Sequence, residues 1–156
     1  MEDSKYEIDR LKKEVRSYVA ESNIKKQELL NIANSKIDNI MTGFGDENET
    51  VISFKELLMF KIGVRNELND GVFFEKTYQD ENKIIFMTYM LSGGGFGVHS
   101  HDCIEICKVQ KGNLIERTRG YRVYEEGSTV IYAPQELHRP YSTKESLYEV
   151  TFYRKL

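Results

Sequence analysis

The feature that most constrains the fold is a run of short strand-like segments from Val72 onward. The segments are rich in β-branched and aromatic residues, and turn signals such as "QDEN", "SGGGFG" and "QKGN" separate them. The expected strands are residues 72–78, 83–91, 105–110, 113–119, 121–127, 128–133 and 147–156. Because no helical segment stands between them, the pattern predicts an antiparallel sandwich or barrel and argues against a parallel sheet.

The first 41 residues predict helix, since they contain neither Gly nor Pro. Apolar residues recur at helical spacing at Ile8, Leu11, Val15 and Tyr18. A broader apolar stripe over residues 29–41 is out of phase with them, so either one helix carries a stutter or two helices meet near Asn23. We expect the stripe to pack on the chain's own core or on a second copy, and a dedicated partner-binding helix is the alternative.

The two parts of the chain meet at a polar, glycine-containing linker over residues 42–50. We therefore expect a helical extension and linker over residues 1–50 and a β domain over residues 51–156. Within the β domain, Ser53 and Glu56 have the spacing of a capping box, which predicts one short helix directly before "LLMF".

Composition limits the classes of function. Of the 156 residues, 40% are hydrophobic, which is enough for one packed domain, and the net charge of −3 gives no general attraction to nucleic acid. No apolar run is long enough for a secretory signal or a membrane span. The only cysteines, Cys103 and Cys107, are too few for a disulfide framework, so we expect a cytoplasmic protein with reduced thiols.

The three histidines of the chain carry the strongest functional signal. His99 and His101 are separated by one residue, and on a strand this spacing turns both rings to the same face. Glu105 follows after room for a short turn, and His138 follows the expected strand at 128–133. A single histidine in a strand is more often hydrogen-bonded or exposed than a ligand, but here all of them fall where strand ends can converge. Three imidazoles and a carboxylate suit Fe(II), Mn(II), Zn(II), Ni(II) or Cu(II).

These residues resemble the two sequence motifs of the cupin superfamily. Gly93, His99, His101, Glu105 and Gly112 reproduce the first motif in full. "GSTVIYAPQELH" resembles the second, which begins at Gly127 and keeps the histidine at His138. The second motif departs from the family at three positions: Ala133 stands for a proline, Gln135 for a glycine and Ser142 for a frequent asparagine. The resemblance covers about residues 70–156.

The resemblance implies a jelly-roll β-barrel with one divalent transition metal (Fe, Mn, Zn or Ni), held by His99, His101, Glu105 and His138. Many cupins use such a metal for oxygenase, decarboxylase, isomerase or lyase chemistry. Others only bind a ligand, as in the sensor part of AraC-like regulators, whose motif text is close to "HSHDCIEI". A stand-alone sensor fits this chain better than a DNA-binding regulator does.

Further residues are candidates for the pocket around the metal. Cys107 shares the strand parity of Glu105, which predicts that it faces the interior as a packing residue or as a group beside the metal. Arg117 and Arg119 lie on one face of the expected strand at 113–119; they are either solvated or clamp a carboxylate or phosphate. Tyr132 is a candidate for the pocket mouth or for the core.

The residues are compatible with three functions. The first is a metal-dependent enzyme of oxygenase, isomerase or lyase type that acts on a small polar molecule, and the second is a non-catalytic protein that senses or sequesters a small molecule. The third is an interaction protein that works through the helical extension. In each case we expect a homodimer that binds neither nucleic acid nor a membrane.

Overall fold

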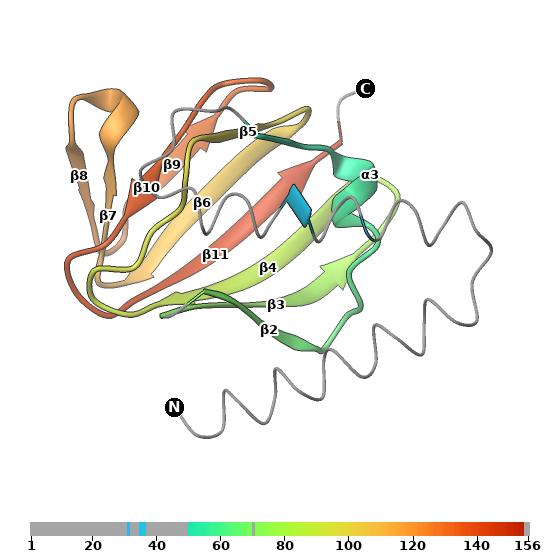
Figure 1. Cartoon of the computed structure of the whole chain (residues 1–156), viewed down its shortest axis with the longest axis horizontal. Coiled ribbons are helices and arrows are strands. Elements are labelled where there is room, and N and C mark those ends of the chain that lie inside the picture. Colours follow the sequence, from blue (N-terminus) through green and yellow to red (C-terminus); the bar gives the residue numbers. More distant parts are fainter. Residues whose placement is uncertain (1–30, 32–34, 37–49, 70, 155–156) are drawn as a thin grey trace.

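The computed structural model describes residues 31, 35–36, 50–69 and 71–154, and the structural statements below concern these residues (Figure 1). The predicted helical extension lies outside them, apart from Asn31, Ser35 and Lys36, which are helical. The predicted domain boundary at residue 50 stays a prediction. Among the described helices, none combines the length and the apolar character needed to cross a bilayer.

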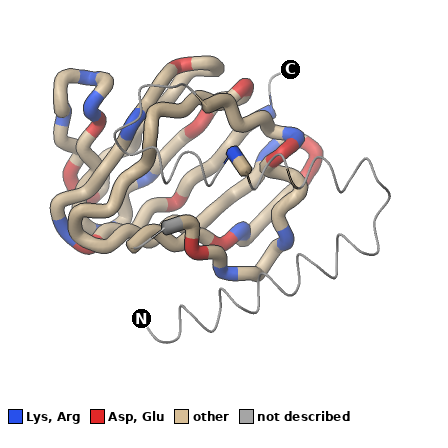
Figure 2. The backbone as a smooth tube through the Cα atoms, in the orientation of Figure 1, with Lys and Arg blue, Asp and Glu red and all other residues tan. Residues whose placement is uncertain are grey.

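The described chain is mainly β-strand. Its strands are β1 (Thr50–Ile52), β2 (Arg65–Asn69), β3 (Val72–Gln79), β4 (Lys83–Met90), β5 (His99–His101), β6 (Ile104–Lys111), β7 (Asn113–Glu116), β8 (Arg122–Glu125), β9 (Thr129–Tyr132), β10 (Pro140–Tyr141) and β11 (Ser146–Tyr153). The short helix α3 spans Phe54–Leu57, and a 3₁₀ turn spans Arg117–Arg119. Figure 2 shows that Lys and Arg positions are interleaved with Asp and Glu positions along this backbone.

The strands form three sheets. The largest has the order β2-β3-β4-β11-β6-β9, and a smaller one has the order β10-β7-β8. In both, neighbouring strands are antiparallel, as predicted, whereas β1 and β5 form a separate parallel pair. The prediction of a closed barrel is corrected. β2 and β9 are the edge strands of the large sheet, and the described strands of this sheet do not continue into the other two sheets (Figure 1).

Strict alternation of side chains places the core on one face of the large sheet. Along β4, Ile84, Phe86, Thr88 and Met90 are buried while the residues between them are half-buried. Glu105 and Cys107 on β6 face the same way, and they neighbour buried residues of β9 and β11 in the pairing register. This alternation is what directs the carboxylate of Glu105 into the interior.

The predicted capping box at Ser53 and Glu56 is confirmed. The Ser53 hydroxyl accepts a hydrogen bond from the Glu56 amide at 3.1 Å, and the Glu56 carboxylate accepts one from the Ser53 amide at 3.3 Å. Lys36 forms an ion pair with the same carboxylate at 2.8 Å. The Phe54 amide also donates to Asp102 at 2.8 Å, which ties α3 to the turn between β5 and β6.

Two parts of the strand prediction were wrong. The expected strand at 113–119 ends at Glu116, because the Glu116 carboxylate accepts the amide of Thr118 and the chain turns there into the 3₁₀ segment. The short strands β1, β2 and β10 were not predicted, and β5 was predicted only through the H-x-H spacing of His99 and His101. Strands of two to five residues present too little alternation to be recognised.

Candidate metal centre

Three histidines from two segments meet on the inner side of the large sheet. His99 and His101 are the ends of β5, and His138 lies in the loop between β9 and β10. The backbones of His99 and His138 exchange two hydrogen bonds, of 2.9 and 3.1 Å. These bonds place the two imidazoles side by side, with ring centroids 4.0 Å apart.

The strand β5 is held on both sides. On one side it pairs with β1, from Thr50 against His99 to Ile52 against His101. On the other side the loop before His138 pairs with it, because the Gln135 amide donates to the His101 carbonyl at 2.6 Å. The H-x-H segment is therefore a short central strand whose two buried rings face one way, as the sequence predicts.

Each imidazole is oriented by a backbone carbonyl at its Nδ1 atom. His99 Nδ1 lies 2.8 Å from the Gly97 carbonyl, His101 Nδ1 lies 3.1 Å from that of Ile52, and His138 Nδ1 lies 2.9 Å from that of Glu136. A carbonyl only accepts hydrogen bonds, so each Nδ1 carries the proton and each neutral ring keeps a lone pair on Nε2. Metal-binding histidines use the same device.

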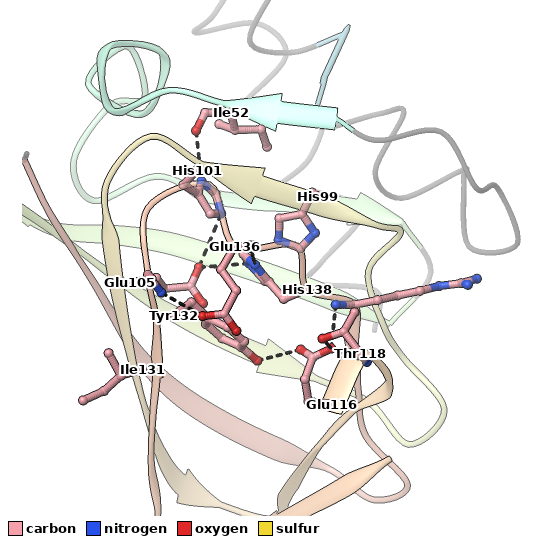
Figure 3. A network of polar contacts seen from close by, with 12 residues as sticks. Ile52, His99, His101, Glu105, Glu116, Thr118, Ile131, Tyr132, Glu136 and His138 are labelled. Carbon is pink, nitrogen blue, oxygen red and sulfur yellow. Dashed lines mark hydrogen bonds and ion pairs between the residues drawn. The ribbon is translucent and has the colours of Figure 1, made fainter. Parts of the chain in front are cut away.

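The free nitrogens converge with one carboxylate. The candidate ligand atoms of His99, His101 and His138 all lie within 4.8 Å of one another, and the three residues are buried. Glu105 Oε1 lies 3.4 Å from His101 Nε2 and 3.6 Å from His138 Nε2 (Figure 3). The carboxylate thus approaches two of the three imidazoles.

Each imidazole also contacts one aromatic ring. The centroid of His99 lies 5.5 Å from that of Phe96, and the centroid of His101 lies 4.6 Å from that of Phe152. His138 stacks on Tyr132 at 4.1 Å with an interplanar angle of 17°. A carbonyl and an aromatic neighbour together leave each ring little freedom to rotate.

A buried carboxylate, Glu116, holds two neighbours of His138 in place. It is fully buried and accepts hydrogen bonds from the Tyr132 hydroxyl at 2.7 Å and from the Arg139 amide at 2.8 Å (Figure 3). The amide and the hydroxyl of Thr118 donate to the same group at 3.0 and 2.8 Å. Glu116 therefore fixes both the ring that stacks on His138 and the peptide that follows it. The residue patterns did not single out Glu116 for this role.

Burial and neighbouring charges shift the pKa values of the three imidazoles in different directions. Burial lowers the pKa of His99 and of His101 well below the usual 6.5, and the neighbouring imidazoles lower both further. Burial also acts to lower the pKa of His138, but the negative charge of Glu105 outweighs it, so that pKa is raised. Near neutral pH the first two rings are thus in the neutral form that binds metals.

The residues fit a transition metal by an observation independent of the motif. His138 Nε2 is buried and has no hydrogen-bond partner, which costs free energy in a packed interior. An ion placed between this atom and the other two Nε2 atoms would satisfy all three. Three buried histidines can accordingly hold a metal ion, and imidazole nitrogen suits Zn, Fe, Ni and Cu.

A cavity of about 100 Å³ adjoins the histidines. His99, His101, His138 and Glu105 form part of its wall, and aliphatic and aromatic side chains form most of the remainder. A metal held by the imidazoles would therefore border a cavity with room for a further ligand, as catalytic metal sites do and closed structural sites do not.

The structure brings some of the predicted pocket residues to this cavity and not others. Cys107 lines it, buried as predicted, and burial raises the pKa of its thiol well above the usual value. Tyr132 does not line it and instead stacks on His138. Arg117 and Arg119 are absent from its described lining, because the 3₁₀ turn removes the strand on which their shared orientation was predicted.

The two arginines make other contacts. Arg119 donates to Tyr124 at 2.9 Å, to the Ile131 carbonyl at 2.6 Å and to Glu136 at 2.8 Å. The guanidinium of Arg117 lies 4.1 Å from the centre of the Tyr141 ring. Both groups contact residues around the loop of His138, and their role as an anion clamp stays a prediction.

The turn before His138 keeps its shape without the family's proline and glycine. Gln135 has φ = 65°, the left-handed conformation that glycine adopts most easily. Glu136 stabilises the turn, because its carboxylate accepts the Ala133 amide at 3.0 Å and its own amide donates to the Ala133 carbonyl at 3.1 Å. Side-chain hydrogen bonds have thus replaced the conformational preferences that the motif lost.

Comparison with known proteins supports the fold at low sequence identity. No family model matches the chain, and no curated protein matches it. Among solved structures, KdgF from Halomonas sp. is 14% identical with a TM-score of 0.55, covering 59% of this chain and 88% of its own. An RmlC-like cupin from Shewanella frigidimarina is 15% identical with a TM-score of 0.55, covering 62% of this chain and 90% of its own. A cupin superfamily protein from Desulfitobacterium hafniense is 7% identical with a TM-score of 0.50, covering 55% of this chain and 80% of its own. The described β domain therefore has a cupin-like fold, as its motifs predicted.

Proposed function

We propose that the chain is a metalloprotein with one divalent transition metal, bound by His99, His101 and His138 with Glu105 as the fourth ligand. One observation carries the proposal: each Nδ1 is occupied by a carbonyl, which leaves Nε2 of each buried ring to bind a metal, and one ligand atom from each of the three residues lies within 4.8 Å of the others. Glu105 is included because its Oε1 lies within 3.4 and 3.6 Å of two of them. Four ligands leave positions on the ion for a further molecule.

We further propose metal-dependent catalysis of oxygenase, isomerase or lyase type on a small molecule held in the cavity. A bound ion supplies a Lewis acid and a template for oxygen ligands. The chain's own part is to orient the imidazoles, to exclude water with an apolar wall and to offer Glu105 and Cys107 beside the reacting molecule. The other titratable side chain of the described lining is Tyr148, whose hydroxyl donates to the Asn113 carbonyl.

A non-catalytic binder is the second candidate, because the same cavity would serve to sense or sequester a molecule. The observation that favours it is the small number of acid–base groups on the described lining. The two candidates share the metal centre and differ only in turnover.

The metal centre is tested by elemental analysis of the purified full chain and of its variants. We expect about one equivalent of a transition metal in the native protein and its loss in His101→Ala. Glu105→Gln should bind metal more weakly, while the matched control Glu126→Gln, at an exposed turn position, should behave like the native protein. A native chain that takes up no Fe(II), Mn(II), Ni(II) or Zn(II) would refute the centre.

Turnover separates the two candidates. Oxygen uptake by the Fe(II)-loaded protein, and product analysis without oxygen, would be measured over a panel of small metabolites. Turnover that disappears in His138→Ala supports the enzyme. Thermal stabilisation by a compound that is recovered unchanged supports the binder.

The proposed assembly is a cytoplasmic homodimer. Cys103 and Cys107 are both free and buried, which agrees with the expectation of reduced thiols. Sedimentation of the full chain and of a chain that starts at Val51 would measure whether the N-terminal 50 residues are needed for a dimer. A monomeric full chain would contradict the proposal.

A further inference from the structure

Four phenylalanine rings in contact with one another line the cavity beside the histidines. Phe60, Phe74, Phe86 and Phe152 line it and touch one another edge to face, with centroid distances of 5.3 to 6.2 Å. We call these four residues the phenylalanine wall. It begins next to the metal centre, because Phe152 contacts His101, and continues through Phe86 and Phe74 to Phe60. Leucine, valine and methionine side chains form much of the remaining described lining.

Apart from the Thr88 hydroxyl, the polar side-chain atoms of the described lining are those of the histidines, Glu105, Cys107 and Tyr148. The Tyr148 hydroxyl donates to the Asn113 carbonyl. The Cys107 thiol is buried. The lining includes no Lys or Arg among the described residues, and the buried Lys76 instead donates to Gln79 at 2.6 Å and to the Leu58 carbonyl at 3.2 Å. A ligand that reaches the phenylalanine wall therefore meets no cation there and hardly any hydrogen-bonding group.

We infer that the metal centre takes an uncharged, mainly apolar ligand with one metal-coordinating head, which is directed at the histidines while its hydrocarbon part lies on the phenylalanine wall. This rests on the proposed metal centre and departs from the polar ligand expected from the sequence. Sugars and dicarboxylates are disfavoured, since their hydroxyls and second carboxylate would lose water without new partners. The cavity of about 100 Å³ is smaller than the apolar cavity of ~150 Å³ that holds benzene, so it suits a hydrocarbon part of roughly four carbon atoms.

Three hydroxamic acids with the same chelating head test the inference on the Zn(II)-loaded full chain. Acetohydroxamic acid has a methyl tail, butanohydroxamic acid adds two methylenes, and succinic monohydroxamic acid carries a carboxylate at a similar length. Affinities would be measured by calorimetry and by thermal shift, after the zinc content has been determined. We expect butanohydroxamic acid to bind about tenfold tighter than acetohydroxamic acid, because two methylenes are buried. Succinic monohydroxamic acid should bind at least tenfold more weakly than butanohydroxamic acid.

A pair of variants locates the effect. Phe60→Ala shortens the wall at a half-buried position, and it should remove most of the gain of butanohydroxamic acid while leaving acetohydroxamic acid unchanged. Phe73→Ala is the matched control, because Phe73 is absent from the cavity lining and contacts Tyr89 in a separate surface hollow. A gain that persists in Phe60→Ala and vanishes in Phe73→Ala would overturn the assignment.

The outcomes separate this inference from the proposed function. Equal or tighter binding of the carboxylate compound, or no binding of any compound to protein that holds one zinc, overturns the inference alone. Failure to take up metal overturns the proposed function, and the cavity is then tested in the metal-free protein with xenon, an apolar probe smaller than benzene. A rise in Tm under xenon supports the apolar cavity, and no rise refutes it.

Discussion

The two halves of the candidate metal centre are built in different ways. The half that contains β5 and Glu105 keeps the complete first cupin motif and is held by backbone pairing, with β1 on one side and the loop of His138 on the other. The half that contains His138 has lost the motif's proline and glycine. It is held by two buried or half-buried carboxylates, Glu116 and Glu136, whose hydrogen bonds fix the turn and the Tyr132 ring.

This difference shows that either backbone pairing or side-chain hydrogen bonds can hold a candidate metal ligand in position. In the first half, the strand geometry alone sets where His99 and His101 point, so the sequence spacing is informative. In the second half, a network of side chains makes a strained turn tolerable, so the local motif is weak although the histidine is in place. We therefore expect the two halves to respond differently to mutation.

The largest effect should come from Glu116→Ala, which breaks the second half only. The Tyr132 hydroxyl, the Arg139 amide and the Thr118 groups would each lose a buried acceptor, which we expect to lower the free energy of unfolding by about 2–4 kcal/mol. Urea unfolding measures this change. Glu126→Ala, at an exposed turn position, is the control and should stay within about 0.5 kcal/mol of the native protein. A Glu116→Ala protein as stable as the control would show that the network does not support the loop.

The next largest effect should come from Gly112→Ala, which tests the first motif. Gly112 has φ = 82°, and a Cβ atom there would collide with the Ser146 side chain and the Glu145 carbonyl. We expect a loss of at least about 2 kcal/mol, from the left-handed backbone and the collision together. Thermal unfolding of Gly112→Ala and Gly127→Ala separates the backbone cost from the cost of the collision. Gly127 has φ = 90° but open space around it, so only the backbone cost applies there. Equal losses in both variants would mean that the collision contributes nothing.

A smaller and opposite effect is expected from Gln135→Gly, which restores the glycine of the second motif. Gln135 has φ = 65°, and relief of this strain should exceed the extra entropy that glycine adds to the unfolded chain. We expect a gain of about 0.5 kcal/mol in unfolding free energy, with metal content unchanged. A loss of stability would show that the Gln135 side chain contributes contacts that outweigh the strain.

The smallest effect concerns protonation of the metal-free protein. The pKa of His138 is raised above 6.5, whereas those of His99 and His101 are lowered well below it. NMR of the imidazole resonances during acid titration should therefore show His138 taking up its proton first. If His138 takes up its proton last, the proposed influence of Glu105 is wrong.

The same shifts have opposite consequences for stability. As pH falls through about 6.5, the unfolded chain takes up protons at His99 and His101 that the folded chain does not, so these two residues lower stability. His138 contributes stability that is fully present below the unfolded value of 6.5 and is lost as pH rises through its raised pKa.

Much of the fold followed from the sequence, because alternation and turn signals are local. The long strands β3, β4, β6 and β11 and the capping box at Ser53 were predicted nearly residue by residue. The ligand set of the site was proposed from the H-x-H spacing, and the structure brings its three histidines together. The parallel pairing of β1 with β5 was not predictable, since it joins residues far apart in a strand of three.

The surroundings of the site were harder to predict for a physical reason. Glu116 belongs to a charged type that is usually exposed, and only the assembled donors around it explain its full burial. Arg117 and Arg119 were misplaced because the Glu116 carboxylate accepts hydrogen bonds from the amide and the hydroxyl of Thr118, and the strand ends there. Residue periodicity reports neither these side-chain hydrogen bonds nor the contacts of Glu116 with Tyr132 and Arg139, which are distant in sequence.

X-ray absorption at the zinc edge of the Zn(II)-loaded full chain tests the central claim most directly. The account predicts three imidazole nitrogens with Zn–N distances of about 2.0–2.1 Å, together with oxygen from Glu105 or solvent, and the imidazole signal should fall in His138→Ala. A sulfur neighbour at about 2.3 Å would instead place Cys107 on the metal. A spectrum of zinc surrounded by oxygen alone, unchanged in His138→Ala, would contradict the claim that these three histidines form a metal centre.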